Sequence, residues 1–146
     1  GDLSDMVTVS QEALILEEGS QLCGFRAGDQ LTLEQLLQGL LIYSGNDAAA
    51  AIAEHVGGTQ ENFVQMMNEE VARLGMSNTH FTNPHGLQDT EHYTSVYDIY
   101  LMLNEAIHYP KFVEILQMSA FTVQYQNTLG QANSIYLDVA SSFSSR

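Results

Sequence analysis

The chain has 146 residues, of which 45% are apolar, so it is long enough for one domain with a hydrophobic core, and its composition does not predict disorder. It carries 4 Lys and Arg residues against 18 Asp and Glu residues, a formal net charge of −14. Because phosphate neutralisation needs the opposite balance, this charge excludes nucleic acid as a partner and disfavours binding to an anionic membrane surface.

The first thirty residues carry weak structural signals. Residues 6–10 alternate and are rich in β-branched side chains, which predicts a short strand. Residues 11–29 are expected to be irregular because glycines interrupt them, with a hairpin through Gly19 and Ser20. Cys23 lies in this segment as the single cysteine, which excludes an internal disulfide and a cysteine-based metal site.

Two strong helical patterns follow one another. Leucines recur at i, i+3, i+4 and i+7 between Leu33 and Leu41, which predicts an amphipathic helix. Thr32 and Gln35 form the capping-box pattern that begins it. Residues 47–56 are mostly strong helix formers, and their small side chains indicate a buried central helix that stops at the next two glycines.

Between these helices lies the corner Ser44-Gly45-Asn46. Gly45 is expected to adopt the left-handed backbone that ends the first helix. Asn46 is expected to cap the second helix, with Asp47 beside the positive end of its dipole. On local signals alone, this is an ordinary helix–helix turn that presents a hydroxyl and a carboxamide.

A third helix is predicted from Thr59 to Gly75, and its methionines are interpreted as core residues. The polar connection after it, residues 76–93, contains a turn at residues 83–86, where Pro fixes φ and Gly allows positive φ. The spacing of its histidines matches no zinc pattern, so the sequence does not predict a metal site. These histidines are His80, His85 and His92.

The last third predicts two helices and a strand. Thr94 is expected to cap a helix that carries apolar residues as far as Ile107, and Pro110 suits the first turn of a short helix. Residues 121–125 alternate, which predicts a half-buried strand. Residues 131–146 are ambiguous, and their Ser-rich end is expected to fray. The predicted fold class is therefore mainly α with a few short strands at the margins.

Four sequence blocks stand in a fixed order and spacing. They are LEQLLQGLLIYSGNDAAAAIAE (33–54), FVQMMNEEVARLG (63–75), MSNTHFTNPHGL (76–87) and YTSVYD (93–98). Joined in this order, they resemble the serine D-alanyl-D-alanine carboxypeptidases, low-molecular-mass penicillin-binding proteins that trim bacterial peptidoglycan. The resemblance covers about residues 4–125 and fades after Tyr125.

That family works with three motifs: Ser-x-x-Lys, Ser-x-Asn and Lys-Thr-Gly. This chain contains only the middle one, and its single lysine, Lys111, belongs to neither of the others. In the family, the first motif lies upstream and the third downstream, so both absences would fall beyond the chain ends. We interpret residues 1–146 as one unit, the helical lobe of a larger two-lobed catalytic domain with the β-lactamase/DD-peptidase fold.

The resemblance implies catalytic roles for Ser44 and Asn46. Ser44 would relay a proton toward the departing D-alanine, and Asn46 would bind the amide of the substrate. Ser44 is not expected to be the nucleophile, because it follows a helix C-terminus, whose partial negative charge disfavours an alkoxide. His85 resembles a family position in a structural turn, and Asp98 is expected to stabilise the first turn of its own helix.

The resemblance further implies a parent enzyme that removes the terminal D-alanine of peptidoglycan stem peptides through an acyl-enzyme. It would act outside the cytoplasm without a metal or organic cofactor, and β-lactams would acylate its missing serine. The chain alone is expected to be inactive and to self-associate through the apolar face that packs on the sheet in the family. Two alternatives remain open: a non-catalytic peptidoglycan-binding or regulatory homologue, and a related β-lactamase.

Overall fold

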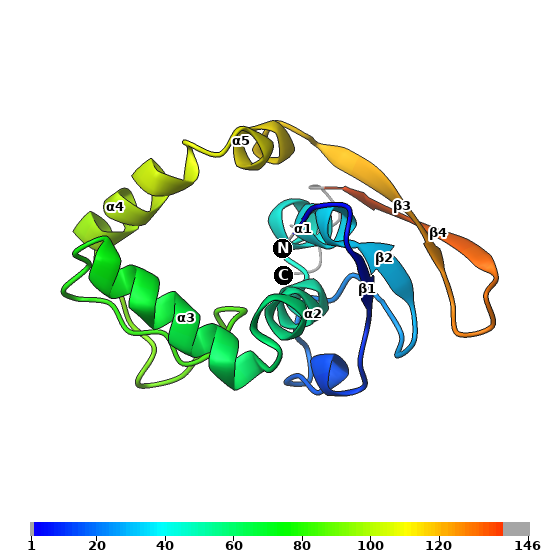
Figure 1. Cartoon of the computed structure of the whole chain (residues 1–146), viewed down its shortest axis with the longest axis horizontal. Coiled ribbons are helices and arrows are strands. Elements are labelled where there is room, and N and C mark those ends of the chain that lie inside the picture. Colours follow the sequence, from blue (N-terminus) through cyan, green and yellow to red (C-terminus); the bar gives the residue numbers. More distant parts are fainter. Residues whose placement is uncertain (1, 139–146) are drawn as a thin grey trace.

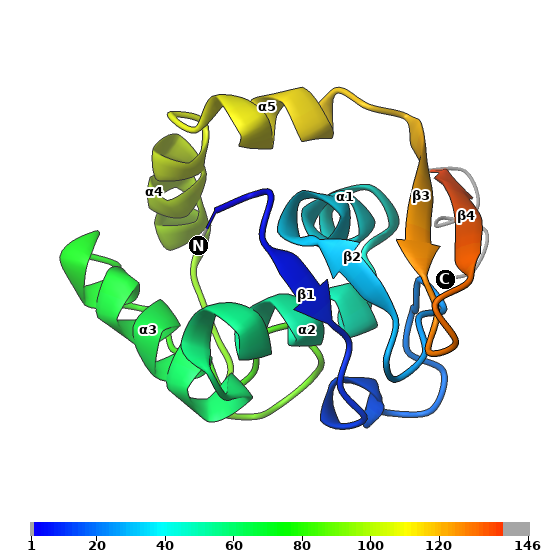
Figure 2. The ribbon, with the colours of Figure 1, turned by 45° about the vertical axis from the view of Figure 1, so that its right-hand side comes forward.

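The computed structural model describes residues 2–138, which form an open ring of helices with a sheet on one side (Figure 1). Helices α3, α4 and α5 make an arch that leaves the end of α2 and returns to the sheet, around α1 and α2 (Figure 2). No helix among the described residues is long and apolar enough to cross a membrane. In chain order, the elements are β1 (Met6–Thr8), the 3-10 helix η1 (Glu12–Leu14), β2 (Gln30–Thr32), α1 (Leu33–Tyr43), α2 (Asn46–Gly57), α3 (Gln60–Arg73), α4 (Val96–Ala106), α5 (Pro110–Leu116), β3 (Ala120–Gln126) and β4 (Ala132–Asp138).

The alanine-rich helix α2 is the buried centre of the fold, which confirms the prediction from its small side chains. All of its residues from Asn46 to Ala53 are buried. α1, α3, η1 and β1 pack against it, because alanine side chains allow neighbouring backbones to approach closely. At its end, a Cβ on Gly57 would lie 2.7 Å from the backbone nitrogen of Phe63, so α3 can turn back over α2 only beside a glycine.

The capping box that begins α1 is also confirmed. Thr32 accepts a hydrogen bond from the Gln35 N–H, and the Gln35 side chain accepts one from the Thr32 N–H. The Gln35 amide then donates to the carbonyl of Gln124 in β3, 2.9 Å away. The cap therefore fixes the start of α1 and its position against the sheet.

The sheet is antiparallel in the order β1-β2-β3-β4. β3 has the predicted alternation, since Phe121 and Val123 are buried and Thr122 and Gln124 are exposed. The hairpin expected at Gly19 and Ser20 does not form: β1 pairs antiparallel with β2, and the chain between these strands holds η1 and turns. That prediction failed because the backbone N–H groups of this segment bind a distant carboxylate, described below, instead of a neighbouring strand.

The connection between α3 and α4 is tied together by polar side chains. The N-cap of α4 is Ser95 and not Thr94 as predicted. The Thr94 hydroxyl instead forms a hydrogen bond with the Thr79 hydroxyl at 2.8 Å. Asp98 lies in the first turn of α4, as expected, and its buried carboxylate also accepts from the Asn78 N–H and the Thr79 hydroxyl. The cap and the carboxylate together hold the loop against the start of α4.

The turn at residues 83–86 forms as predicted. Asn83 Oδ1 accepts from the backbone N–H groups of His85 and Gly86, and Gly86 has a φ of +86°. The Nδ1 atom of His85 accepts weakly from the Leu87 N–H at 3.4 Å. His85 is therefore part of its own loop, which confirms its structural interpretation.

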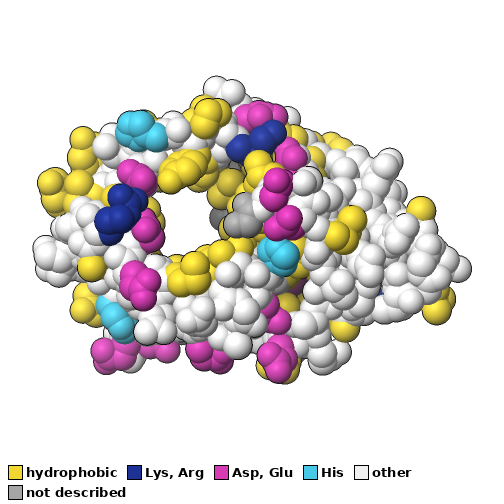
Figure 3. All heavy atoms as spheres, in the orientation of Figure 1, with side chains coloured by type: hydrophobic (Ala, Val, Ile, Leu, Met, Phe, Trp, Pro, Cys, Tyr) yellow, Lys and Arg dark blue, Asp and Glu magenta, His cyan; other side chains and the backbone are white. Residues whose placement is uncertain are grey.

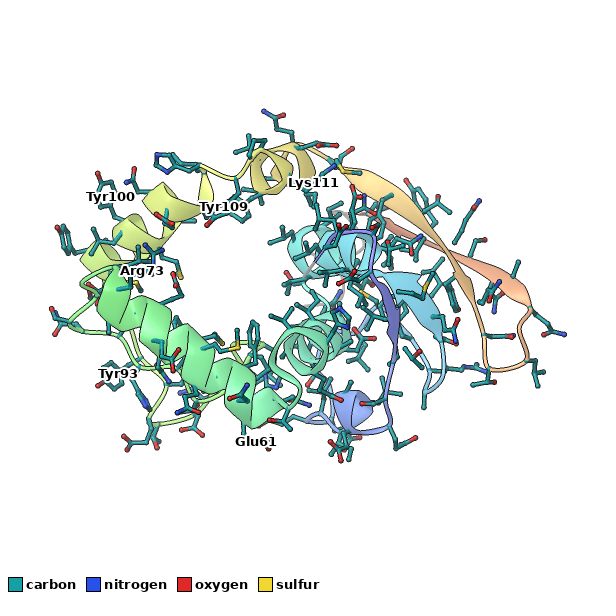
Figure 4. The ribbon with its side chains drawn as sticks, viewed as in Figure 1. Glu61, Arg73, Tyr93, Tyr100, Tyr109 and Lys111 are labelled. Carbon is teal, nitrogen blue, oxygen red and sulfur yellow. The ribbon has the colours of Figure 1, made fainter. Side chains whose placement is uncertain are left out.

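A central opening passes through the molecule between the arch and α1 (Figure 3). Tyr109 points into it from the arch (Figure 4) and lines two adjoining pockets of about 360 and 320 Å³. Both pockets are largely apolar, and both also include Phe112. The other apolar residues of their walls come from α1, α4, α5, the N-terminal segment and the end of α3: Leu3, Leu37, Leu41, Leu74, Met102, Ala106 and Ile115.

Two cations hold the arch closed around this opening. Arg73 of α3 contacts Glu105 of α4 at 3.0 Å, and Lys111 of α5 contacts Glu34 of α1 at 2.9 Å. Each cation also pairs with a carboxylate three residues away on its own helix. The ion pairs between helices are partly exposed, so each contributes little to the free energy of folding, although it joins two helices.

Candidate active site

The corner between α1 and α2 has a backbone that differs from the prediction by one residue. Ser44, not Gly45, has the left-handed backbone, with φ 56° and ψ 39°. Gly45 is extended and is the N-cap of α2, so Asn46 is the first helical residue and not the cap. Among the described residues, Ser44 is the one non-glycine residue with a positive φ, a conformation that stores strain and often marks functional sites.

Gly45 has an ordinary extended backbone, but there is no room for a side chain at this position. A Cβ at this position would lie 2.3 Å from the Cys23 Sγ atom and 3.0 Å from a carboxylate oxygen of Asp47. Cys23 also crowds Gly39 on α1, where a Cβ would lie 2.9 Å from the same sulfur. The segment around Cys23 therefore packs directly against the corner.

Asn46 is held by two hydrogen bonds to one acceptor. Its backbone N–H and its side-chain Nδ2 both donate to the carbonyl of Gln21, each at 2.9 Å. The Asn46 Oδ1 atom accepts no hydrogen bond from the described residues, and the residue as a whole is 8% exposed. The side chain is thus fixed through its nitrogen, which leaves its oxygen as an acceptor for an incoming N–H group.

Asp47 organises the segment that holds Asn46. Its carboxylate is fully buried and accepts from four backbone N–H groups. Three belong to consecutive residues: Cys23 at 2.9 Å, Gly24 at 3.0 Å and Phe25 at 3.3 Å. The fourth is that of Ala48, in the first turn of α2. The sequence placed Asp47 only beside the helix dipole, and the longer-range role had no local signal.

The Cys23 thiol is not a candidate nucleophile. It donates a long hydrogen bond to the Gly39 carbonyl at 3.6 Å. Burial raises the pKa of the thiol strongly, and the charge of Asp47 raises it further. At neutral pH the sulfur is therefore a protonated packing group, because only the thiolate reacts readily.

The Ser44 hydroxyl has no activating partner in the described chain. The side chain is half-buried and makes no hydrogen bond to another described residue. Lys111 is bound to Glu34, which lies in the first turn of α1, whereas Ser44 follows the last turn. Ser44 is ten positions after Glu34, which is about 15 Å along the helix, so Lys111 is not the base for this hydroxyl.

The loop histidines do not form a second site. His80 Nδ1 contacts the Glu91 carbonyl at 2.7 Å, and His92 Nδ1 accepts from the Thr82 N–H at 3.0 Å. Burial lowers the pKa of His85, and the neighbouring His92 lowers it further. Within residues 2–138, no group of three His, Cys, Asp or Glu side chains is placed to hold a metal ion.

A family model, a protein sequence and a solved structure that match this chain all belong to one group of enzymes. The model of the D-alanyl-D-alanine carboxypeptidase family matches residues 2–142. D-alanyl-D-alanine carboxypeptidase DacF of Bacillus subtilis is 38% identical over 87% of this chain and 31% of that protein. A solved D-alanyl-D-alanine carboxypeptidase of Mycobacterium tuberculosis is 31% identical, with a TM-score of 0.78, over 92% of this chain and 49% of that one.

The fold is also shared with a transpeptidase. The DD-transpeptidase of Streptomyces K15 superposes with a TM-score of 0.86 at 25% identity, over 94% of this chain and 56% of that one. The chain spans about a third of the length of the curated relatives it matches.

Proposed function

The chain belongs to the D-alanyl-D-alanine carboxypeptidase family, and from this premise we propose that it supplies one wall of a serine-type acyl-transfer site in a longer protein. The parent would remove the terminal D-alanine of peptidoglycan stem peptides, and β-lactams would bind at the same place. It would act outside the cytoplasm. The observation that carries the proposal is the corner itself, where a strained serine and an anchored asparagine stand two residues apart.

Ser44 and Asn46 have separate roles in this site. Asn46 accepts the amide N–H of the substrate with Oδ1, because its nitrogen is already held by Gln21. Ser44 passes a proton toward the leaving amine, since its hydroxyl can both donate and accept and has no competing partner in the described chain. Acyl transfer also needs a nucleophile with a base, and donors for the oxyanion, and these would come from other parts of the parent.

One feature supports a larger domain around residues 1–146. The two pockets at the central opening are largely apolar, and Tyr109, which lines both, is 59% exposed. Further chain from the parent would cover these walls.

The test uses the parent protein with single substitutions. Ser44→Ala should reduce release of D-alanine from a D-Ala-D-Ala peptide by about 100-fold or more, the usual contribution of a proton-transfer group. It should still become covalently labelled by a fluorescent penicillin, but more slowly, because Ser44 is a relay and not the nucleophile. Complete loss of labelling by Ser44→Ala, with the fold intact, would make Ser44 the nucleophile and overturn this assignment.

Asn46→Ala should raise KM and lower kcat/KM for the same peptide, since the substrate amide loses its acceptor. The matched control is Ser77→Ala, which removes an exposed hydroxyl from the turn after α3. Its kinetics should equal those of the parent. Unchanged kinetics in both Ser44→Ala and Asn46→Ala would contradict the proposed site.

A further inference from the structure

The outer face of α4 is an apolar stripe that no other element covers. Val96, Tyr100, Leu103 and Ile107 follow one another at spacings of 4, 3 and 4 residues, the repeat of a helix seam that packs on another helix. Their side chains are exposed by 87%, 60%, 47% and 55%. Tyr97 and Ile99 flank the stripe and are exposed by 66% and 38%. These six residues are called the α4 seam.

The α4 seam is separate from the central opening. The opposite face of α4 turns inward, where Met102 and Glu105 line the larger pocket and Asp98 is buried. Tyr100, in contrast, points away from the ring on its outer side (Figure 4). Chain that fills the central opening would therefore leave the α4 seam uncovered.

The α4 seam carries no charge in a strongly acidic protein. The two carboxylates of α4, Asp98 and Glu105, are both on the inward face. The positions beside the stripe are occupied by Tyr97, Ile99 and Asn104, where paired helices usually place charges. Two copies of this chain can thus meet here without bringing carboxylates together, whereas elsewhere a net charge of −14 opposes contact between copies.

The exposed area fits a second copy. Tyr97 and Tyr100, each more than half exposed, supply on the order of 250 Å² of surface between them. With the four aliphatic side chains, the α4 seam reaches on the order of 600 Å², close to the ~800 Å² per partner of a standard stable interface. Asn104 and His108 are exposed at its edge and can complete a polar rim.

We propose that the α4 seam is a dimer interface, in which α4 packs against α4 of a second copy of this chain about a two-fold axis. The helices are antiparallel, so that the positive end of each dipole meets the negative end of the other. The axis passes between Tyr100 and Leu103. Tyr100 then contacts Leu103 of the second copy, and Val96 contacts Ile107 of the second copy.

The first test measures molar mass by sedimentation equilibrium at about neutral pH. The unchanged chain should have the mass of two copies, and Tyr100→Glu, which places two carboxylates in the interface, should have the mass of one. Tyr136→Glu is the matched control, because Tyr136 is also 66% exposed but lies on β4; its mass should stay that of two copies. Raising the salt concentration should increase the dimer fraction, since it screens the repulsion between acidic copies.

Three results would overturn the proposal. They are a single-copy mass for the unchanged chain, a dimer that survives Tyr100→Glu, and a dimer that salt dissociates. The second result, together with a single-copy mass for Leu41→Glu, would assign self-association to the central opening instead. None of these masses depends on the acyl-transfer chemistry, so the dimer and the proposed function can fail separately.

A second test remains valid even if Tyr100→Glu unfolds. Mixing Tyr100→Cys with Leu103→Cys under oxidising conditions should give a disulfide-linked dimer of the two different variants, more than 10-fold faster than either variant alone. Cys23 gives little background, because it is buried and protonated. Equal rates in the mixture and in the single variants would refute the antiparallel arrangement.

Discussion

Asp47→Asn tests whether the corner depends on one buried carboxylate. Its two oxygens accept from the N–H groups of Cys23, Gly24, Phe25 and Ala48 at 2.9–3.3 Å. An amide keeps one oxygen, so two of these donors lose their acceptor and face an NH₂ group. Hydrogen bonds to a charged group contribute about 1.5–3 kcal/mol each, so the substitution should lower the free energy of unfolding by about 3–5 kcal/mol.

The assay is urea unfolding of the chain followed by far-ultraviolet circular dichroism. Two matched controls separate the effect from loss of a charge. Asp89→Asn, on an exposed turn, should change the free energy of unfolding by less than about 0.5 kcal/mol. Asp98 is also buried, but Asp98→Asn should lower the free energy of unfolding by less than Asp47→Asn does. One oxygen of Asp98 accepts both of its hydrogen bonds, and an amide can retain that oxygen.

A cost below about 1 kcal/mol for Asp47→Asn would refute the reasoning, since it would mean that these donors are satisfied elsewhere. Complete unfolding of Asp47→Asn without urea would agree with the prediction, because the total free energy of unfolding of such a domain is only about 5–15 kcal/mol.

Three further predictions concern the same regions. The pKa of His85 is lowered by burial, so the unfolded chain binds more protons than the folded one as the pH falls below 6.5, the ordinary value. Urea unfolding should therefore show a stability that declines below that pH, and His85→Gln should reduce the decline; an identical pH profile would refute this role. Cys23 should react with a thiol reagent only after unfolding, and fast reaction in the native chain would contradict its burial. Gly45→Ala should cost about 1–3 kcal/mol by overpacking against Cys23, and Cys23→Ala should recover part of it in a double-mutant cycle; strict additivity would exclude the contact.

Local signals in the sequence predicted much of the helical structure. Thr32 and Gln35 form the capping box because that pattern needs only residues three apart. The alanines of α2 indicated a buried helix because small side chains pack closely whatever the partner. The roles proposed for Ser44 and Asn46 came from the resemblance alone, since a Ser-Gly-Asn turn by itself indicates no chemistry.

The differences from the sequence prediction lie where distant parts of the chain are in contact. At the corner, the left-handed residue is Ser44 and not Gly45, and Cys23, more than twenty residues earlier, packs beside the glycine. Asp47 lies in the first turn of α2 as predicted, but it also binds the segment that includes Cys23, which no local signal indicated. Ser95, not Thr94, caps α4, and the Thr94 hydroxyl pairs with that of the distant Thr79. The Ser-rich end, expected to fray, lies outside the described residues.

The central claim is that Ser44 and Asn46 serve a nucleophile that this chain does not carry. The most direct measurement is incubation of the isolated chain, and of the parent protein, with a fluorescent penicillin, followed by denaturing electrophoresis. The account predicts a label on the parent that survives denaturation and none on residues 1–146. A stoichiometric, denaturation-resistant label on the isolated chain, lost in Ser44→Ala, would contradict it.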